Sequence, residues 1–145
     1  MRATVLAGYG VASGRSGDPR FPGGTLAMQL EPFRQRGLDL SGYYLGTLNL
    51  SIAPHSYRVL RPSTTLRNVR WHPTEPPEDF SFFDCRLLMD DGRVYEGLIY
   101  YPHPDTKPDH VQPDDVLVVL AERVEGIGYG DRVWLEVVGD QIELI

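Results

Sequence analysis

The chain has 145 residues, of which 20 are acidic and 14 are basic, so its formal net charge is -6 at pH 7. This length fits one domain over residues 1–145, and the acidic balance argues against nucleic acid or a membrane as partner, because either is bound by a basic surface. Gly and Pro account for 27 residues and only 23% of the chain is charged, which is typical of a globular domain rich in turns.

The chain begins with an apolar segment that runs into a glycine-rich one. Residues 3–12 are mostly apolar but include Gly8 and Gly10, which predicts a strand that bends, bulges or lets another group approach its backbone. Residues 13–24 contain too many Gly and Pro residues for a regular element and therefore predict a loop. Loops of that length in small domains are usually functional or mobile.

A strand, a short helix and a second strand are predicted next. Residues 25–30 fit a short strand, and residues 31–37 fit a helix of at most two turns. Pro32 suits the first position of this helix, and Gly37 suits its end. Residues 44–52 alternate apolar and polar side chains, which predicts a strand with one polar face.

The remainder of the chain carries mainly strand signals. Two pairs of segments flank tight turn sequences and predict hairpins, namely residues 80–89 with 93–101 and residues 132–138 with 141–145. The other segments are, in chain order, proline-interrupted strand fragments, a polar loop and an apolar strand: residues 55–77, 102–113 and 116–121.

These segments amount to seven or more short strands with one helix of marginal length. A parallel doubly wound sheet needs long helices between its strands, so we predict a mostly β fold, a small barrel of six to eight strands with one short helix. The sequence has no run of roughly 20 apolar residues, and its first residues lack the apolar core of a signal peptide. We therefore expect a cytoplasmic protein, and we expect it to be a monomer.

Neither the histidines nor the single cysteine forms a catalytic or metal-binding motif. His55, His72, His103 and His110 lack the spacing of zinc ligands, and we interpret them as loop residues. Cys85 falls in the middle of a predicted strand, so we expect it in the core. One cysteine also excludes an internal disulfide and is consistent with a reducing compartment.

Glycines gather at the end of the first predicted strand and in the loop after it. They stand at positions 8, 10, 14, 17, 23 and 24, with Arg15 and Arg20 among them. Backbone N–H groups without obstructing side chains, together with one or two arginines, suit a phosphate chain. The alternative is a flexible surface loop, and composition alone does not decide between the two.

Thr47 and Asn49 lie two residues apart on the polar face of the strand predicted over residues 44–52. A hydroxyl and an amide oxygen side by side are neutral oxygen ligands, which suit Mg²⁺ shared with substrate phosphates. The alternative is that both residues occupy the outer side of a half-buried strand. Asn is disfavoured in strands, which favours a functional role for Asn49.

The glycine-rich segment and the strand around Asn49 together resemble a known family. The sequence GVASG at residues 10–14, with Gly17 further on, is followed by a short predicted helix and by GTLNL at residues 46–50. This order of motifs is similar to that of the archaeal CTP-dependent riboflavin kinases, whose cradle-loop β-barrel binds CTP and riboflavin and produces FMN. The resemblance covers about the first 52 residues, and the rest of the chain agrees mainly in order and spacing.

The resemblance implies roles for individual residues. Thr47 and Asn49 would hold the magnesium ion, and Thr106 and Asp115 would contact the flavin. The nucleotide would be held by residues of the first loop and by one arginine after the strand at residues 116–121: Gly10, Ala12, Ser13, Gly14, Arg15, Ser16, Gly17 and Arg123.

In this hypothesis the ribityl hydroxyl of riboflavin attacks the terminal phosphoryl group of the nucleotide. Asp115 would orient or deprotonate that hydroxyl, or alternatively it only begins a strand. Phosphoryl transfer depends mainly on positioning and on charge neutralisation, so a missing histidine motif does not count against a kinase.

Two other functions fit the same sequence. One is a non-catalytic barrel that binds a nucleotide or a flavin, because a fold does not determine its function. The other is a protein-interaction module with an exposed aromatic patch, although aromatic residues on strands are more often in the core. The residues of such a patch would be Trp71, Phe80, Phe82, Phe83, Tyr100 and Tyr101.

Overall fold

The computed structural model of the chain describes residues 1–6, 24–107 and 113–145. Within these ranges it contains nine strands, one α-helix and one short 3-10 helix. In chain order they are β1 (Arg2–Leu6), α2 (Thr25–Gln35), β2 (Leu48–Ser51), β3 (Tyr57–Val59), β4 (Thr64–Val69), β5 (Glu78–Leu88), β6 (Val94–Pro102), η1 (Pro104–Thr106), β7 (Val116–Ala121), β8 (Arg132–Val137) and β9 (Ile142–Leu144).

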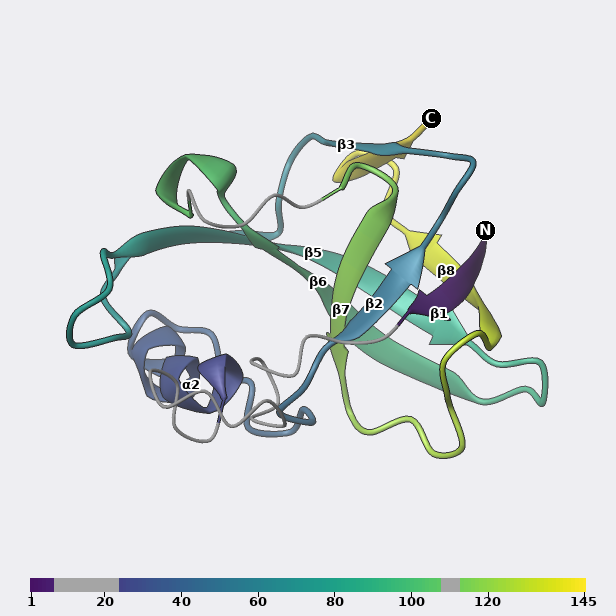
Figure 1. Cartoon of the computed structure of the whole chain (residues 1–145), viewed down its shortest axis with the longest axis horizontal. Helices are drawn as coiled ribbons and strands as arrows, with labels where there is room; N and C mark the ends of the chain where they lie inside the picture. The colour runs from purple at the N-terminus through teal and green to yellow at the C-terminus, as the bar shows by residue number, and fades with distance from the viewer. Residues whose placement is uncertain (7–23, 108–112) are drawn as a thin grey trace.

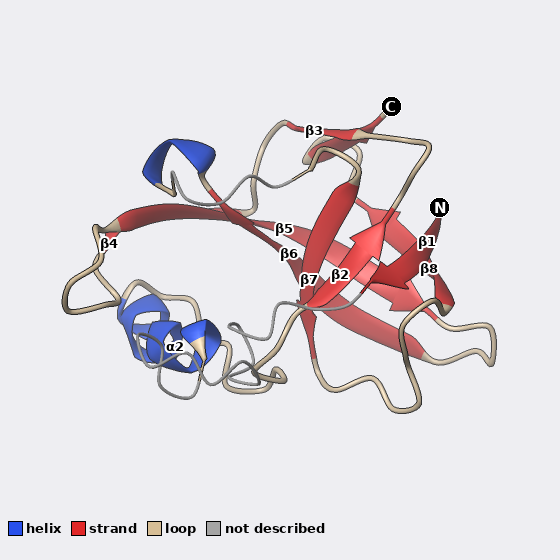
Figure 2. Ribbon diagram, viewed as in Figure 1, coloured by secondary structure: helices blue, strands red, loops and turns tan. Residues whose placement is uncertain are grey.

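Six strands form a barrel-like ring (Figures 1 and 2). Their order is β5-β6-β7-β2-β1-β8, and β8 pairs back onto β5 so that the sheet closes. β4 extends the sheet beyond β5, and β3 and β9 pair separately. The predicted fold class is confirmed, since the chain is mostly β with one α-helix in its described part.

The apolar side chains form two separate clusters. One takes residues from all six strands of the ring and fills its interior, with Leu50, Phe83 and Val119 among its members. The other lies between α2 and the outer face of β5, β6 and β7. There the ring of Phe33 meets Phe80 edge-on, with 4.9 Å between the ring centroids. β7 is therefore buried on both faces, which explains its continuous apolar sequence. β5 is covered on both faces only as far as Phe83, and beyond it Asp84 and Arg86 are exposed on the outer face.

The aromatic residues that the interaction-module alternative would expose do not form an exposed patch. Five of the six residues are buried, each with at most 8% of its surface exposed: Trp71, Phe80, Phe82, Phe83 and Tyr100. Tyr101 is half-buried and packs edge-on against Phe83. These rings are core residues, as aromatic side chains on strands usually are.

The helix begins earlier than predicted. Residues 25–30, predicted as a strand, form the first half of α2, and Pro32 lies inside the helix instead of at its first position. Leu26, Gln29 and Phe33 are the buried residues of α2 and have the spacing of one helix face. A short apolar run does not distinguish strand from helix by itself, and here packing against β5 decides the outcome.

The first predicted hairpin is confirmed, whereas the pairing of the second is wrong. β5 and β6 pair over nine positions around the turn at Gly92, which has a φ of 94°. Residues 132–138 and 141–145 contain strands on either side of a tight turn, but β9 pairs with β3 and not with β8. Both edges of β8 are already taken by β1 and β5, so ring closure leaves no edge for β9.

In the described part of the chain, no helix has both the length and the apolar character that crossing a bilayer would require.

Gly97 on β6 lies opposite Cys85 on β5 and Ala121 on β7. A Cβ at this position would lie 2.8 Å from the carbonyl oxygen of Leu120. We expect Gly97→Ala to lower the free energy of unfolding by about 1–3 kcal/mol, because neighbouring backbones would have to separate. Gly139→Ala, where an added Cβ meets nothing within 4 Å, serves as the control. Equal urea midpoints for the two variants would contradict this prediction.

Candidate functional site

Two side-chain oxygens near the start of β2 are buried and have no hydrogen-bond partner among the residues that the structure describes. They are Oγ1 of Thr47, directly before the strand, and Oδ1 of Asn49 within it. Asn49 is only 4% exposed, so the alternative of a solvated outer position does not hold for it. A buried polar atom without a partner costs about 1–3 kcal/mol, and such atoms are rare in native proteins unless they serve a function.

The alternation of β2 determines where Asn49 points. Leu50 and Ile52 are fully buried in the interior of the ring. Asn49 is one residue from Leu50 and therefore points to the opposite face of the strand. It lies across from Val118 of β7, and Val118 belongs to the cluster under α2. The predicted second face of this strand therefore exists and lies on the side of the α2 cluster, with Asn49 buried and Thr47 and Ser51 half-buried.

Residues 7–23 follow directly on Leu6, whose register partner is Asn49. The predicted nucleotide loop is therefore joined to the fold beside this asparagine. Its proposed binding residues lie outside the described residues: Gly10, Ala12, Ser13, Gly14, Arg15, Ser16 and Gly17.

Arg123 lies at the same end of the β2–β7 pair as Thr47. The backbone N–H of Tyr44 donates to the carbonyl of Ala121 at 2.9 Å, which holds the chain before β2 beside the end of β7. The guanidinium carbon of Arg123 is 5.9 Å from the centroid of the Tyr44 ring. Both side chains are exposed, so a cation and an aromatic face are available to a ligand at this end.

Asp115 lies at the opposite end of the same strand pair. Its carbonyl accepts a hydrogen bond from the N–H of Ile52 at 2.8 Å, whereas Asn49 pairs with Val118, three residues further along. At about 3.3 Å per residue, this places the Asp115 backbone about 10 Å along the strands from Asn49. The structure thus brings Thr47, Asn49 and Arg123 to one end and leaves Asp115 apart from them.

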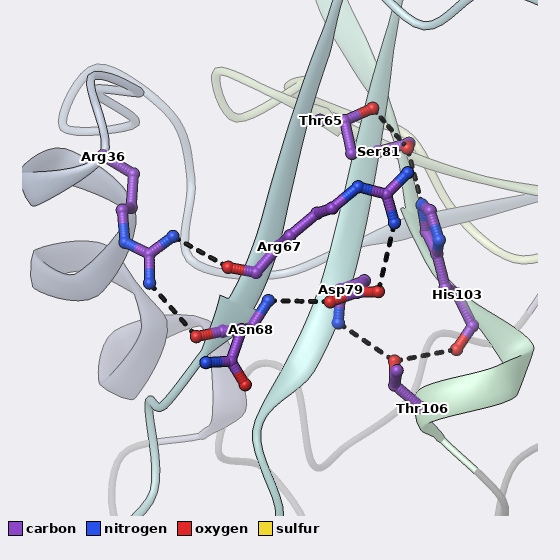
Figure 3. Close-up of polar contacts among 8 residues, drawn as sticks. All are labelled: Arg36, Thr65, Arg67, Asn68, Asp79, Ser81, His103 and Thr106. Atoms are coloured by element: carbon purple, nitrogen blue, oxygen red, sulfur yellow. Dashed lines mark hydrogen bonds and ion pairs between the residues drawn. The ribbon is translucent and has the colours of Figure 1, made fainter.

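The Thr106 hydroxyl connects η1 to β5 (Figure 3). It accepts the backbone N–H of Asp79 at 2.9 Å and donates to the carbonyl of His103 at 3.2 Å. The carboxylate of Asp79 accepts the backbone N–H of Asn68 at 2.7 Å and pairs with Arg67 at 3.4 Å. Thr106 therefore has a structural role, and a flavin contact from it would use its remaining lone pair.

Asn68 itself lies at an irregular point of β4. Its φ is +54°, and the register with β5 shifts between Leu66 and Val69. Arg36, just after α2, donates to the carbonyls of Arg67 and Asn68 at 2.8 and 3.1 Å (Figure 3). These contacts hold the end of α2 beside β4.

A second chain of polar contacts runs from Thr65 to His103 (Figure 3). Oγ of Ser81 lies 2.9 Å from Oγ1 of Thr65 and 2.6 Å from Nε2 of His103. Burial lowers the pKa of His103. Ser81 is only 3% exposed, so this serine and histidine pair does not offer an accessible nucleophile.

Sequence reasoning missed Gln29, a buried polar residue on α2. Its side chain is 0% exposed. The hydroxyl of Tyr100 donates to Oε1 of Gln29 at 2.9 Å, whereas Nε2 of Gln29 has no hydrogen-bond partner in the described structure. Burial also raises the pKa of Tyr100, which keeps it protonated and a donor. Helical spacing from Leu26 and Phe33 was the signal that would have placed Gln29 in the core.

Cys85 is a core residue, as predicted. It is buried in the interior of the ring, and burial raises the pKa of its thiol to about 12. Among the residues that the structure describes, no three His, Cys, Asp or Glu side chains gather closely enough to hold a metal ion. Thr47 and Asn49 themselves would offer a metal only neutral oxygens.

Comparison with protein-family models gives no match to this chain, and comparison with curated protein sequences gives none either.

The hydrogen bonds of Thr106 allow its structural role to be tested without measuring flavin binding. We expect Thr106→Val to lower the free energy of unfolding by about 1–2 kcal/mol, because it leaves the half-buried N–H of Asp79 without its acceptor. Thr106→Ser keeps the hydroxyl and should remain within about 0.5 kcal/mol of the original protein. Urea unfolding of the three proteins measures this, and a Thr106→Val protein as stable as Thr106→Ser would show that the contact contributes nothing.

Proposed function

We propose that this protein is a magnesium-dependent riboflavin kinase, which transfers a phosphoryl group from a nucleoside triphosphate, CTP by resemblance, to the 5'-hydroxyl of riboflavin and so produces FMN. The observation that carries the proposal is the pair of buried oxygens without partners, Thr47 Oγ1 and Asn49 Oδ1. They lie in the GTLNL sequence that carries the resemblance.

The two oxygens fit a magnesium ion that arrives with its substrate. Mg²⁺ prefers oxygen ligands, keeps several waters and is usually bound jointly by a few protein groups and substrate phosphates. A hydroxyl and an amide oxygen bring no negative charge, so the phosphates would supply it. When bound, the ion would polarise the phosphate oxygens and offset the charge that develops during transfer.

The groups at the same end of the strand pair support a nucleotide there. The glycine-rich loop follows Leu6, the register partner of Asn49, and Arg123 lies over the exposed ring of Tyr44. In the proposal, Gly10 to Gly17 donate backbone N–H groups to the phosphates and Arg123 neutralises part of their charge.

We assign Asp115 to riboflavin, the substrate that accepts the phosphoryl group, and not to the phosphoryl group itself. Its backbone lies about 10 Å along the strands from Asn49, which suits a contact with riboflavin. Because phosphoryl transfer depends mainly on positioning, the reaction does not require a strong base at the metal pair. Thr106 and Asp115 remain the proposed flavin contacts.

The test is FMN formation. The protein is incubated with riboflavin, Mg²⁺ and each of CTP, ATP, GTP and UTP, and FMN is separated by chromatography. We expect Asn49→Ala to reduce turnover on the order of 100-fold while the protein stays folded, because it removes an oxygen that acts on the transferring charge. Ser51→Ala, on the same face of β2 two residues further on, is the matched control and should retain turnover.

Two outcomes would reject the kinase. One is a folded original protein that produces no FMN with any of the four nucleotides, and the other is full turnover by Asn49→Ala. Quenching of riboflavin fluorescence without FMN would indicate the alternative, a non-catalytic binding barrel.

A further inference from the structure

A row of four residues crosses the sheet on the face that α2 covers. Phe82 lies opposite Tyr100, and Asn49 lies opposite Val118. The register of β6 and β7, in which Ile99 pairs with Val119, places Tyr100 opposite Val118. Residues that face each other across strands project to the same side of a sheet, so Tyr100 and Asn49 share this face. They are two strands apart, which is about 10 Å.

Gln29 of α2 projects onto this row. The Tyr100 hydroxyl donates to Oε1 of Gln29 at 2.9 Å. The opposite end of the amide, Nε2, then presents its N–H donors without a partner in the part of the chain that the structure describes. The side chain is completely buried, so bulk solvent does not reach this donor.

The polar atoms without partners on this face are complementary. Asn49 and Thr47 present oxygens, which accept hydrogen bonds or bind a cation, whereas Gln29 presents only donors. Gln29 shares its helix face with Leu26 and Phe33, which belong to the apolar cluster under α2. The buried carboxylate of Glu78 lies close enough to Tyr100 to help raise its pKa. A phosphate there would lose its hydration without a cation to replace it, whereas a neutral carbonyl on a flat ring would not.

We propose that Gln29 donates a hydrogen bond from Nε2 to a carbonyl oxygen of the substrate's planar heterocycle, and that Tyr100 is the residue that orients it. This inference rests on the proposed function, since it places the ring of a substrate whose phosphates lie at Thr47 and Asn49. Two rings supply the same chemistry, the carbonyl-bearing ring of riboflavin and the carbonyl-bearing base of a nucleotide. Adenine has no carbonyl and therefore lacks this contact.

The experiment measures binding, so that it does not depend on turnover. Dissociation constants are measured for riboflavin, by fluorescence quenching, and for CTP and ATP with Mg²⁺, by calorimetry. The proteins are the original chain, Gln29→Met and Tyr100→Phe. Both variants lose the buried hydrogen bond between Tyr100 and Gln29, but only Gln29→Met loses the N–H donors.

We expect Gln29→Met to weaken binding of one carbonyl-bearing ligand by about tenfold or more, and Tyr100→Phe to weaken it clearly less. A loss confined to riboflavin identifies the flavin carbonyl as the acceptor. A loss confined to CTP identifies the base, and ATP binding should then be unchanged by Gln29→Met.

Equal effects of the two variants would show that Gln29 only supports the fold, and this would overturn the inference. An original protein that binds none of the three ligands would overturn it as well. Selective loss of binding in Gln29→Met without any FMN formation would retain the carbonyl contact and reject the kinase. If Gln29→Met does not fold, Gln29→Glu replaces it, because it keeps an acceptor for Tyr100 and substitutes an oxygen for the amide nitrogen.

Discussion

The structure depends on β7 and the first part of β5, as far as Phe83, being covered on both faces. Their inner faces close the ring, and their outer faces support α2, so each strand contributes residues to both apolar clusters. On β7 the neighbours Val118 and Val119 belong to different clusters. β2 lies beside β7 in the sheet. The face of β2 that carries Asn49 therefore continues the outer face of β7, which contributes Val118 to the second apolar cluster. This is why a polar residue as ordinary as Asn49 ends up with its amide oxygen out of reach of solvent.

The parts of the fold that were predictable are those determined by local backbone chemistry. The Asp90-Asp91-Gly92 turn specified the β5–β6 hairpin, because Gly92 adopts a positive φ that other residues rarely adopt. The parts that were not predictable depend on contacts distant in sequence. Residues 25–30 are helical because Leu26 and Phe33 pack on β5 and β6. Likewise, β9 pairs with β3 because ring closure occupies both edges of β8, and no local signal in residues 132–145 carries that information.

The candidate site likewise has features that were predictable from the sequence and features that depend on contacts distant in sequence. Alternation in residues 44–52 was enough to place Asn49 on the strand face opposite to Leu50, whereas its burial depends on neighbours distant in sequence, such as Leu6 and Val118. Gln29 was not found because residues 25–30 were assigned to a strand, and a strand would have aligned it with different neighbours. Thr106 was assigned to a ligand by position in the chain, and its bonds to Asp79 and His103 emerge only when η1 is folded against β5.

The net charge of the protein places a further constraint on how a nucleotide could bind. The chain has a formal net charge of -6, and a nucleoside triphosphate is itself strongly negative, so long-range electrostatics oppose their association. A carboxylate pair at Thr47 and Asn49 would hold a free magnesium ion more tightly but would repel the phosphates whenever the ion was absent. Neutral oxygens avoid that repulsion and leave the charge balance to the ion and the phosphates themselves. In the proposed function, ion and nucleotide therefore bind cooperatively, since each supplies the charge that the protein ligands of the other lack.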